Sequence, residues 1–207
     1  MDLKKLEEIL SQHVPAPAVE YCTRLWVDFP FDFKLRKSRQ SKVGDFTCKT
    51  GTTPQITVNH DLNPYLFLMT YVHEVAHHWV HRQYAFRAEA HGDEWKKIFQ
   101  QLMAPLLGPE FFPEPLLSGI IKHMEAPKAS SFADSELTHL FRSVEPHGKD
   151  AVLLSHLPEG SIFHLQGRWF KKGKVRRTRV LCREVKSKRQ YLVPVDAVIS
   201  SAQLALL

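Results

Sequence analysis

The chain has 207 residues, of which 43% are hydrophobic and 24% are charged. This composition is typical of a globular protein of one or two domains and disfavours a disordered chain or a fibrous repeat. No apolar run is long enough to span a membrane, and the residues after Met1 lack the apolar stretch of a signal peptide. We therefore expect a cytoplasmic protein without membrane contact. Three scattered cysteines, too few for a disulfide framework, agree with a reducing compartment.

The charge is distributed unevenly along the chain. Residues 1–150 carry 17 Lys and Arg against 19 Asp and Glu, whereas residues 151–207 carry 11 against 3. The net charge of +6 therefore comes from the C-terminal segment. This asymmetry indicates two functional parts, of which the second suits a polyanionic partner.

The N-terminal residues predict a helix followed by a small sheet. Apolar side chains recur every three or four residues between Leu3 and Leu10, and Pro15 ends this pattern. Strand-like segments follow at residues 31–35, 44–48 and 55–59. The last of these is a candidate edge strand for pairing with an extended peptide.

The strongest helix signal begins at Asn63. Asn63 is a good N-cap, and Pro64 suits the first helical position, where a missing N–H costs nothing. Nothing breaks the helix before about Gln83. A second helix is expected from Asp93 and a third over residues 114–124.

The C-terminal third changes character. A segment rich in Ala, Ser and Pro leads into a short predicted helix, and we assign residues 126–150 to a linker that contains this helix. Residues 151–207 then form a small antiparallel β module. Its strands are expected at residues 161–165, 168–171, 175–185 and 190–193, with turns at Gly167 and at residues 172–174 and 186–189.

The sequence His73-Glu74-Val75-Ala76-His77 lies inside the strongest helix and has the form H-E-x-x-H. Residues four apart share one face of a helix, so both imidazoles can reach a single Zn²⁺. Glu74 projects from the neighbouring edge, where it can accept a proton from the attacking water without ligating the metal. The alternative is a pair of solvated helix histidines.

A catalytic zinc takes three protein ligands and keeps one position open. His78 points about 100° away from His77, and His81 lies two turns from His73 along the same helix. His91 fits best, because it immediately precedes the second helix and closes the site from another direction. The alternative for His91 is an ordinary polar residue at a helix start.

These residues resemble the SprT-like metallopeptidases, relatives of the Spartan protease, over roughly residues 15–105. The resemblance is carried by an ordered set of motifs: Ile56-Thr57-Val58-Asn59, Asn63-Pro64, the H-E-x-x-H sequence, and His91-Gly92-Asp93-Glu94-Trp95. It implies a zincin-like α+β domain over residues 1–125, in which helices pack on a small sheet. It also implies one zinc ion held by His73, His77 and His91, with Glu74 as general base acting on a protein or peptide substrate.

The C-terminal module departs from the family pattern. Many bacterial members carry a zinc ribbon with four cysteines, whereas this region contains only Cys182. The module looks like a metal-free counterpart of such a ribbon. Its hairpins then need apolar packing, which we expect from Phe163, Leu165, Phe170, Val180, Leu181, Tyr191 and Val193.

Residues 168–189 hold eleven Lys or Arg and one acid, Glu184. Cations that neutralise phosphates and aromatic rings that stack on bases are typical of nucleic-acid contacts. The candidate contact residues are Arg168, Trp169, Lys171, Lys172, Lys174, Arg176, Arg177 and Arg179. The alternative is a β-hairpin whose basic edges prevent aggregation. In the Spartan branch, the resemblance implies a protease acting on proteins attached to DNA.

The sequence thus predicts a zinc-dependent endopeptidase of SprT-like type with a DNA-contacting module. The rival hypothesis is a nucleic-acid-binding protein whose zinc domain is only a scaffold, and a weaker third is a metal-dependent hydrolase of a non-peptide bond. No spacing argument selects an oxyanion-stabilising residue among Tyr71, Tyr84 and His78.

Overall fold

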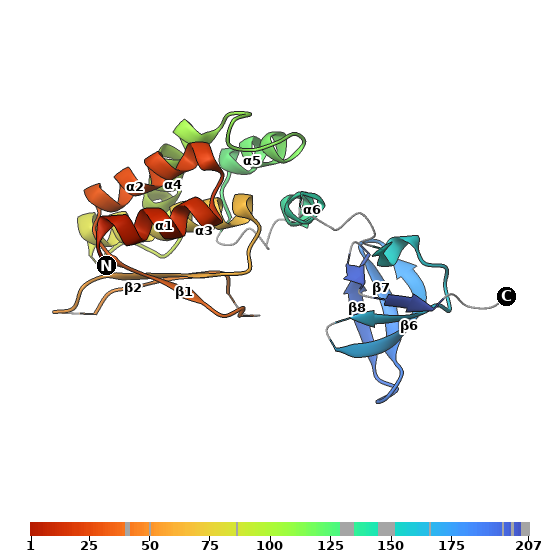
Figure 1. The fold of residues 1–207 in the computed structure, drawn as a ribbon. Coiled ribbons are helices and arrows are strands. Elements are labelled where there is room, and N and C mark those ends of the chain that lie inside the picture. The colour runs from red at the N-terminus through yellow and green to blue at the C-terminus, as the bar shows by residue number, and fades with distance from the viewer. Residues whose placement is uncertain are drawn as a thin grey trace. The chain divides into compact units, whose positions relative to one another are not determined.

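The computed structural model describes residues 1–39, 42–49, 51–85, 87–128, 135–144, 152–165, 167–195, 197–199 and 201–203. The fold is mixed α+β and divides into two compact units, Met1–Val144 and Glu145–Leu207 (Figure 1). Among the described helices, none has the length and apolar character needed to cross a membrane.

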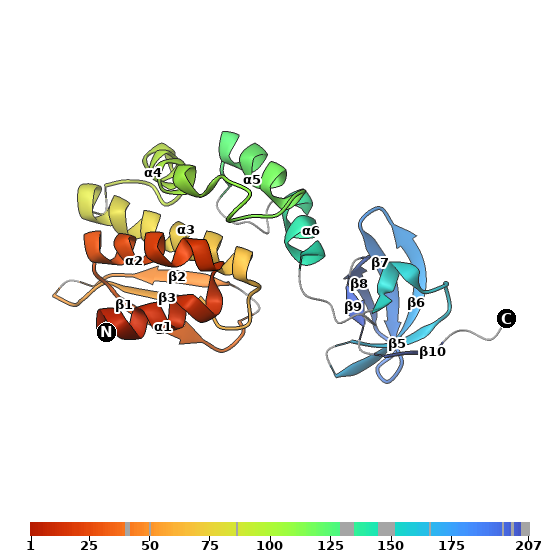
Figure 2. The same ribbon diagram turned by 45° about the horizontal axis from the view of Figure 1, so that its top comes forward.

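The first unit is built from helices and one three-stranded sheet, with the long helix α3 beside the sheet (Figure 2). Its elements are α1 (Leu3–His13), the 3₁₀ turn η1 (Ala16–Ala18), α2 (Val19–Asp28), β1 (Asp32–Arg36), β2 (Gly44–Thr47), β3 (Gln55–Asn59), α3 (Pro64–Tyr84), α4 (Asp93–Met103), η2 (Ala104–Leu106), α5 (Leu116–Glu125) and α6 (Ser135–Ser143).

The sheet has the order β1-β3-β2, in which β3 runs parallel to β1 and antiparallel to β2. Phe33, Ile56 and Phe46 form one row across it. The expectation that residues 55–59 form an edge strand is wrong, because β3 is central and four of its five residues are buried. The two edge strands are β1 and β2, of which β2 contacts α3.

Helix α3 is fixed at its start by Asn63. The Asn63 side-chain oxygen accepts a hydrogen bond from the Leu66 N–H at 2.9 Å, and its amide nitrogen donates to the Phe141 carbonyl at 3.0 Å. Because Phe141 belongs to α6, one side chain both caps α3 and ties α6 to it. Most residues of α3 are buried, so the helix runs through the core of the unit.

Helix α6 belongs to the first unit. Leu137 and Phe141, one helical turn apart, are 1% and 2% exposed in the first core, and α6 packs against α5. The linker prediction for residues 126–150 is therefore wrong for this helix, whose apolar face makes it part of the fold. Residues 129–134 and 145–150 of the predicted linker lie outside the described residues.

The second unit contains a five-stranded antiparallel sheet with the order β10-β5-β6-β7-β8 and a short β4-β9 pair. Its elements are β4 (Val152–Leu153), the 3₁₀ turn η4 (Leu154–His156), β5 (Ile162–Leu165), β6 (Arg168–Arg176), β7 (Arg179–Glu184), β8 (Gln190–Pro194), β9 (Val198–Ile199) and β10 (Ser201–Gln203). Phe163, Phe170, Val180 and Val193 are buried in its core as expected, whereas Leu181 lies outside that core cluster.

Strand β6 continues through the predicted turn at residues 172–174. The register shifts between Lys172 and Val175, so Gly173 lies in a bulge. A Cβ atom at Gly173 would lie 2.5 Å from the Leu181 carbonyl oxygen. This close approach of the neighbouring backbone, and not a turn, is the reason for a glycine at this position. The chain reverses instead at Arg177, whose φ is 50°.

Candidate functional site

Two helices bring three imidazoles together in the first unit. His73 and His77 lie one turn apart on α3, and His91 stands two residues before α4. Their Nε2 atoms are mutually close: 3.2 Å from His73 to His77, 2.9 Å from His77 to His91 and 3.2 Å from His91 to His73. His91 has φ 62°, a backbone conformation that His adopts more readily than most residues.

This spacing matches a metal centre. Tetrahedral ligands at 2.0–2.1 Å from a zinc ion are separated by about 3.3 Å. Hydrogen bonds alone do not account for the cluster, because each Nε2 of a neutral imidazole is either a donor or an acceptor. Three such atoms in mutual contact always include a donor–donor or acceptor–acceptor pair. His73, His77 and His91 therefore lie close enough to bind a metal ion, the one group of this kind among the described residues.

The electrostatics of the triad favour neutral imidazoles. Burial, followed by the neighbouring His77 and His91, lowers the pKa of His73 well below its usual value. Burial and His91 lower the pKa of His77 to about 4, and burial lowers the pKa of His91. At neutral pH the three rings thus keep the lone pairs that a cation needs.

Trp95 forms an aromatic wall against the triad. Its ring centroid lies 4.6 Å from that of His73, 5.4 Å from that of His77 and 4.7 Å from that of His91. The side chain is fully buried and stacks on Phe99. One indole therefore restrains all three imidazoles. The available sequence signal was the place of Trp95 in the first turn of α4, four residues after His91.

Glu74 lies on the side of α3 that faces β2. It is 6% exposed, and burial, with a smaller contribution from Asp45, raises its pKa to about 8. Lys42, Arg39 and a hydrogen bond from the Phe46 backbone act in the opposite direction.

Gly44 provides the space for this carboxyl group. A Cβ atom at position 44 would lie 2.9 Å from the Glu74 Cγ atom and 2.6 Å from the Thr70 Cγ2 atom, and would contact the Glu74 carboxylate. The sequence analysis did not select Gly44. A glycine at the first position of a predicted strand was the signal that another group approaches closely there.

The other histidines of α3 lie outside the triad. His78 is 5% exposed and packs on Phe46, with ring centroids 5.4 Å apart, and His81 also contacts Phe46. Both therefore face the sheet side. The helical spacing predicts this for His78, whereas His81 was expected on the face of His73 and His77, two turns away. A histidine that the sequence analysis did not select, His123 on α5, is buried and close enough to lower the pKa of His73.

The candidate oxyanion-stabilising residues differ in accessibility. Tyr71 is fully buried and its hydroxyl donates to the Cys22 carbonyl at 3.0 Å, so it belongs to the core. His78 is likewise packed in the core. Tyr84 is 40% exposed at the last position of α3.

The prediction that Lys172 contacts nucleic acid is wrong. Lys172 was expected on the surface, yet it is 4% exposed. Its ammonium group donates to the carbonyls of Leu154 at 2.8 Å and Ser155 at 3.3 Å, and also to that of Leu157. The alternation of strand β6 turns this side chain inward, so it fastens η4 to the sheet and is not available to a ligand.

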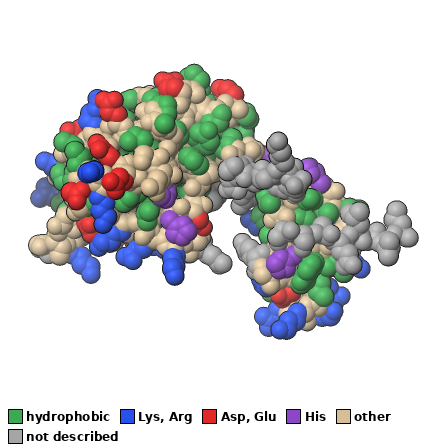
Figure 3. Space-filling view, in the orientation of Figure 1, with side chains coloured by type: hydrophobic (Ala, Val, Ile, Leu, Met, Phe, Trp, Pro, Cys, Tyr) green, Lys and Arg blue, Asp and Glu red, His purple; other side chains and the backbone are tan. Residues whose placement is uncertain are grey.

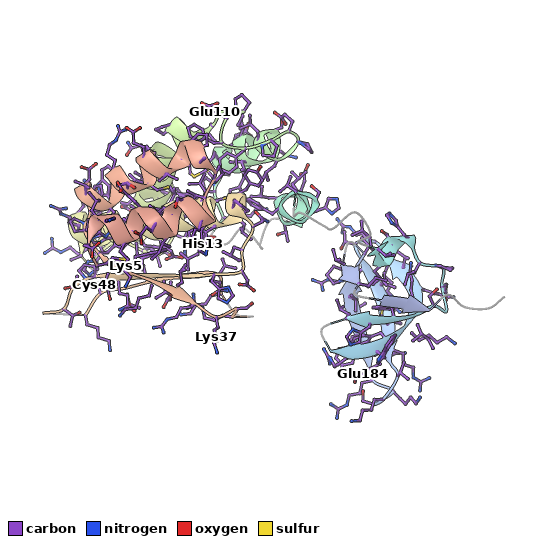
Figure 4. All side chains as sticks on the ribbon, in the orientation of Figure 1. Lys5, His13, Lys37, Cys48, Glu110 and Glu184 are labelled. Carbon is purple, nitrogen blue, oxygen red and sulfur yellow. The ribbon has the colours of Figure 1, made fainter. Side chains whose placement is uncertain are left out.

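The other seven candidates do not form one surface. Arg168 lies over the rings of Phe170 and Tyr191 and 3.9 Å from Glu184, which Figure 4 labels. Trp169 and Lys171 are exposed on β6. The remaining four, Lys174, Arg176, Arg177 and Arg179, are exposed near the β6–β7 turn. Figure 3 shows Lys and Arg side chains gathered at the lower end of the second unit.

Comparisons of this chain with protein-family models, curated proteins and solved structures gave no match. The site is therefore interpreted from its own geometry, and the resemblance to SprT-like metallopeptidases stays a prediction.

Proposed function

We propose that the first unit is a zinc-dependent endopeptidase of SprT-like type. The observation that supports this most directly is the convergence of three Nε2 atoms, with the buried Glu74 next to His73 in the chain. His73, His77 and His91 would hold the ion and leave its fourth position open. When bound, zinc supplies a Lewis acid that polarises the scissile carbonyl and increases the acidity of water.

Glu74 is the general base of this proposal. It follows His73 directly in α3, its carboxyl group faces β2, and it is not one of the three members of the triad. Burial raises the pKa of Glu74 to about 8, and a divalent cation bound nearby would lower it and so favour the carboxylate form. It would accept a proton from the attacking water and donate it to the leaving amine.

Strand β2 is the element that we assign to substrate positioning. It is an edge strand next to the Glu74 carboxyl group, and an extended peptide can add to a free strand edge through main-chain hydrogen bonds. This role was expected for residues 55–59, but the sheet order moves it to β2. The proposed substrate is accordingly a protein segment in extended conformation.

The excess of Lys and Arg in the second unit supports the proposal that the substrates are DNA-associated proteins. The cations of this unit are separate from the triad, which lies entirely in the first unit. The rival proposal, favoured by the same charge, is a nucleic-acid-binding protein whose metal unit is only a scaffold.

Metal analysis combined with a cleavage assay separates these proposals. The full chain is expected to bind one zinc ion, which His73→Ala removes and Glu74→Gln retains. Glu74→Gln is expected to lose cleavage of an unstructured protein substrate, with or without DNA. The matched control is His81→Ala, which removes an imidazole of the same helix outside the triad and should leave the zinc content unchanged.

Two outcomes decide against parts of the proposal. Full proteolysis by Glu74→Gln would show that the mechanism is wrong. A wild-type chain that holds zinc, binds DNA and cleaves nothing in either condition would favour the scaffold proposal.

A further inference from the structure

One face of the sheet of the second unit packs on the hydrophobic core, and the opposite, outer face does not. Side chains alternate along a strand, and those opposite the buried set share one surface. The register places Trp169 beside His164, and Lys171 beside Arg183 on one side and Ile162 on the other. We call this the outer face, and it consists of Ile162, His164, Trp169, Lys171, Leu181, Arg183, Gln190 and Leu192.

A pocket opens on the outer face. It has a volume of about 370 Å³, and its lining includes Lys171, Arg183 and Gln190 from three successive strands. Gly160 and Gly173 add backbone to the wall. The pocket therefore presents two cations and an amide donor in one row.

The positive charge of this pocket favours an anionic ligand. Lys171 and Arg183 are direct cross-strand partners, an arrangement of like charges that destabilises a sheet. No carboxylate among the described residues forms an ion pair with either of them. The lining contains one acid, Glu159, and three cationic residues, of which Lys172 directs its ammonium group to the carbonyls of η4 and Leu157. Lys171 and Arg183 therefore still outnumber the acid. An anionic group bound between them would relieve their repulsion.

Trp169 indicates what kind of anion fits. It is 46% exposed, with its ring centroid 5.1 Å from that of His164. It precedes Lys171 by two residues on the same face of β6, a separation of about 6.6 Å along a strand. A planar group stacked on the indole would thus hold an attached phosphate close to the pocket.

We propose that the outer face binds single-stranded nucleic acid, with a base stacked on Trp169 and a backbone phosphate between Lys171 and Arg183. Stacking on an exposed aromatic ring needs a base whose face is free, which a single strand offers and a paired duplex does not. The site differs from the predicted set. It keeps Trp169 and Lys171 and adds Arg183 and Gln190, and it excludes the other six predicted residues: Arg168, Lys172, Lys174, Arg176, Arg177 and Arg179. It is independent of the proposed peptidase activity.

Binding is tested with the full chain carrying Glu74→Gln, so that no cleavage interferes. Fluorescence anisotropy is measured with one labelled 15-nucleotide sequence as single-stranded DNA, single-stranded RNA and duplex DNA, at two salt concentrations. Both single strands are expected to bind more tightly than the duplex. The ratio between DNA and RNA identifies which of the two single strands is preferred.

Variants of the outer face test the two contacts separately. Trp169→Ala is expected to weaken single-strand binding roughly 5- to 150-fold, whereas Trp169→Phe keeps a stacking ring and most of the affinity. Lys171→Gln and Arg183→Gln are each expected to reduce the slope of log affinity against log salt by about 0.7. Arg176→Gln, which removes the same charge outside the pocket, is the matched control and should leave the slope unchanged.

Three results would overturn the inference. The first is a duplex that binds as tightly as the single strands, and the second is full affinity in a Trp169→Ala chain. The third is an Arg176→Gln chain that loses as much slope as Lys171→Gln. Circular dichroism of Trp169→Ala and Trp169→Phe shows whether the module stays folded. If Trp169→Ala does not fold, the test rests on Trp169→Phe, which should keep most of the single-strand affinity.

Discussion

At the level of single residues, the geometry of the candidate metal site depends on side chains outside the histidine triad. Trp95 contacts all three imidazoles, and Gly44 allows β2 to approach Glu74. A triad of flexible histidines would lose conformational entropy on binding a cation, and side chains already packed against a buried indole have lost much of it. The residues around the triad therefore prepare it for binding.

Gly44→Ala is expected to lower the cleavage rate about 10- to 100-fold while the zinc content stays at the wild-type level. The added methyl group would lie 2.6 Å from the Thr70 Cγ2 atom and 2.9 Å from the Glu74 Cγ atom. Either β2 or the carboxylate must move, and a displacement of about 1 Å is enough for such a loss. The histidines are not touched. Steady-state kinetics and metal analysis of the same preparation measure both effects.

Thr47→Ala is the matched control for this variant, because Thr47 is exposed on the same strand. It should cleave at the wild-type rate. A Gly44→Ala chain with normal activity, or one that has lost its zinc, would contradict the role assigned to Gly44.

At the level of elements, local signals predicted α3 closely. The N-cap Asn63 and the first-turn Pro64 gave its start, and the expected end near Gln83 lies one residue from the observed Tyr84. His73, His77 and their shared face follow from helical geometry. The position of His91 depended on the next helix start, which Gly92 and Asp93 also mark locally.

Elements whose place depends on distant partners were not predictable. Nothing within residues 55–59 says that β1 and β2 pair on either side of β3. The glycine at position 173 marks a bulge, because the carbonyl that it faces belongs to β7. Similarly, Lys172 resembles its basic neighbours in sequence, and only the fold brings three carbonyl groups to its ammonium group.

Lys172→Met is expected to destabilise the second unit by about 2–4 kcal/mol, because the carbonyls of η4 lose a charged donor inside the core. Methionine keeps the apolar stem, so the loss reports the hydrogen bonds more than the packing. Hydrogen exchange followed by mass spectrometry is expected to show faster exchange in peptides from residues 152–195. Peptides from the first unit and the zinc content should not change.

Lys171→Met is the control for this variant, since its side chain is exposed one position earlier in the same strand. It should leave the exchange pattern unaltered. Equal destabilisation by both substitutions would mean that the buried hydrogen bonds of Lys172 do not stabilise the module.

At the level of the whole molecule, the two units have two separate hydrophobic cores. Among the described residues, the core cluster around α3 is formed by the first unit and the cluster around Phe163 and Phe170 by the second. All three triad histidines lie in the first unit, and the candidate nucleic-acid surface lies in the second. Ligands of each unit should therefore stabilise that unit alone.

Zinc is expected to stabilise the first unit selectively, by about 4 kcal/mol when the free ion is at a thousand times its dissociation constant. Hydrogen exchange of the full chain should slow in peptides of residues 64–103 when zinc is added and speed up with a chelator. Peptides of residues 152–195 should exchange at the same rate in both conditions. Because His73→Ala removes a ligand, zinc should have no effect on that variant.

The protection from hydrogen exchange that zinc gives the first unit is expected to depend on pH. Burial lowers the pKa of His77 to about 4, below the value of about 6.5 for an unfolded histidine. Between these values the unfolded chain binds protons that the folded site does not, so the stability contributed by this group falls as the pH drops from about 6.5 to 4. Zinc competes with protons for the same lone pairs. The zinc-dependent protection should therefore persist at pH 6 and disappear toward pH 4, and its loss already at pH 6.5 would contradict imidazole ligands buried as described.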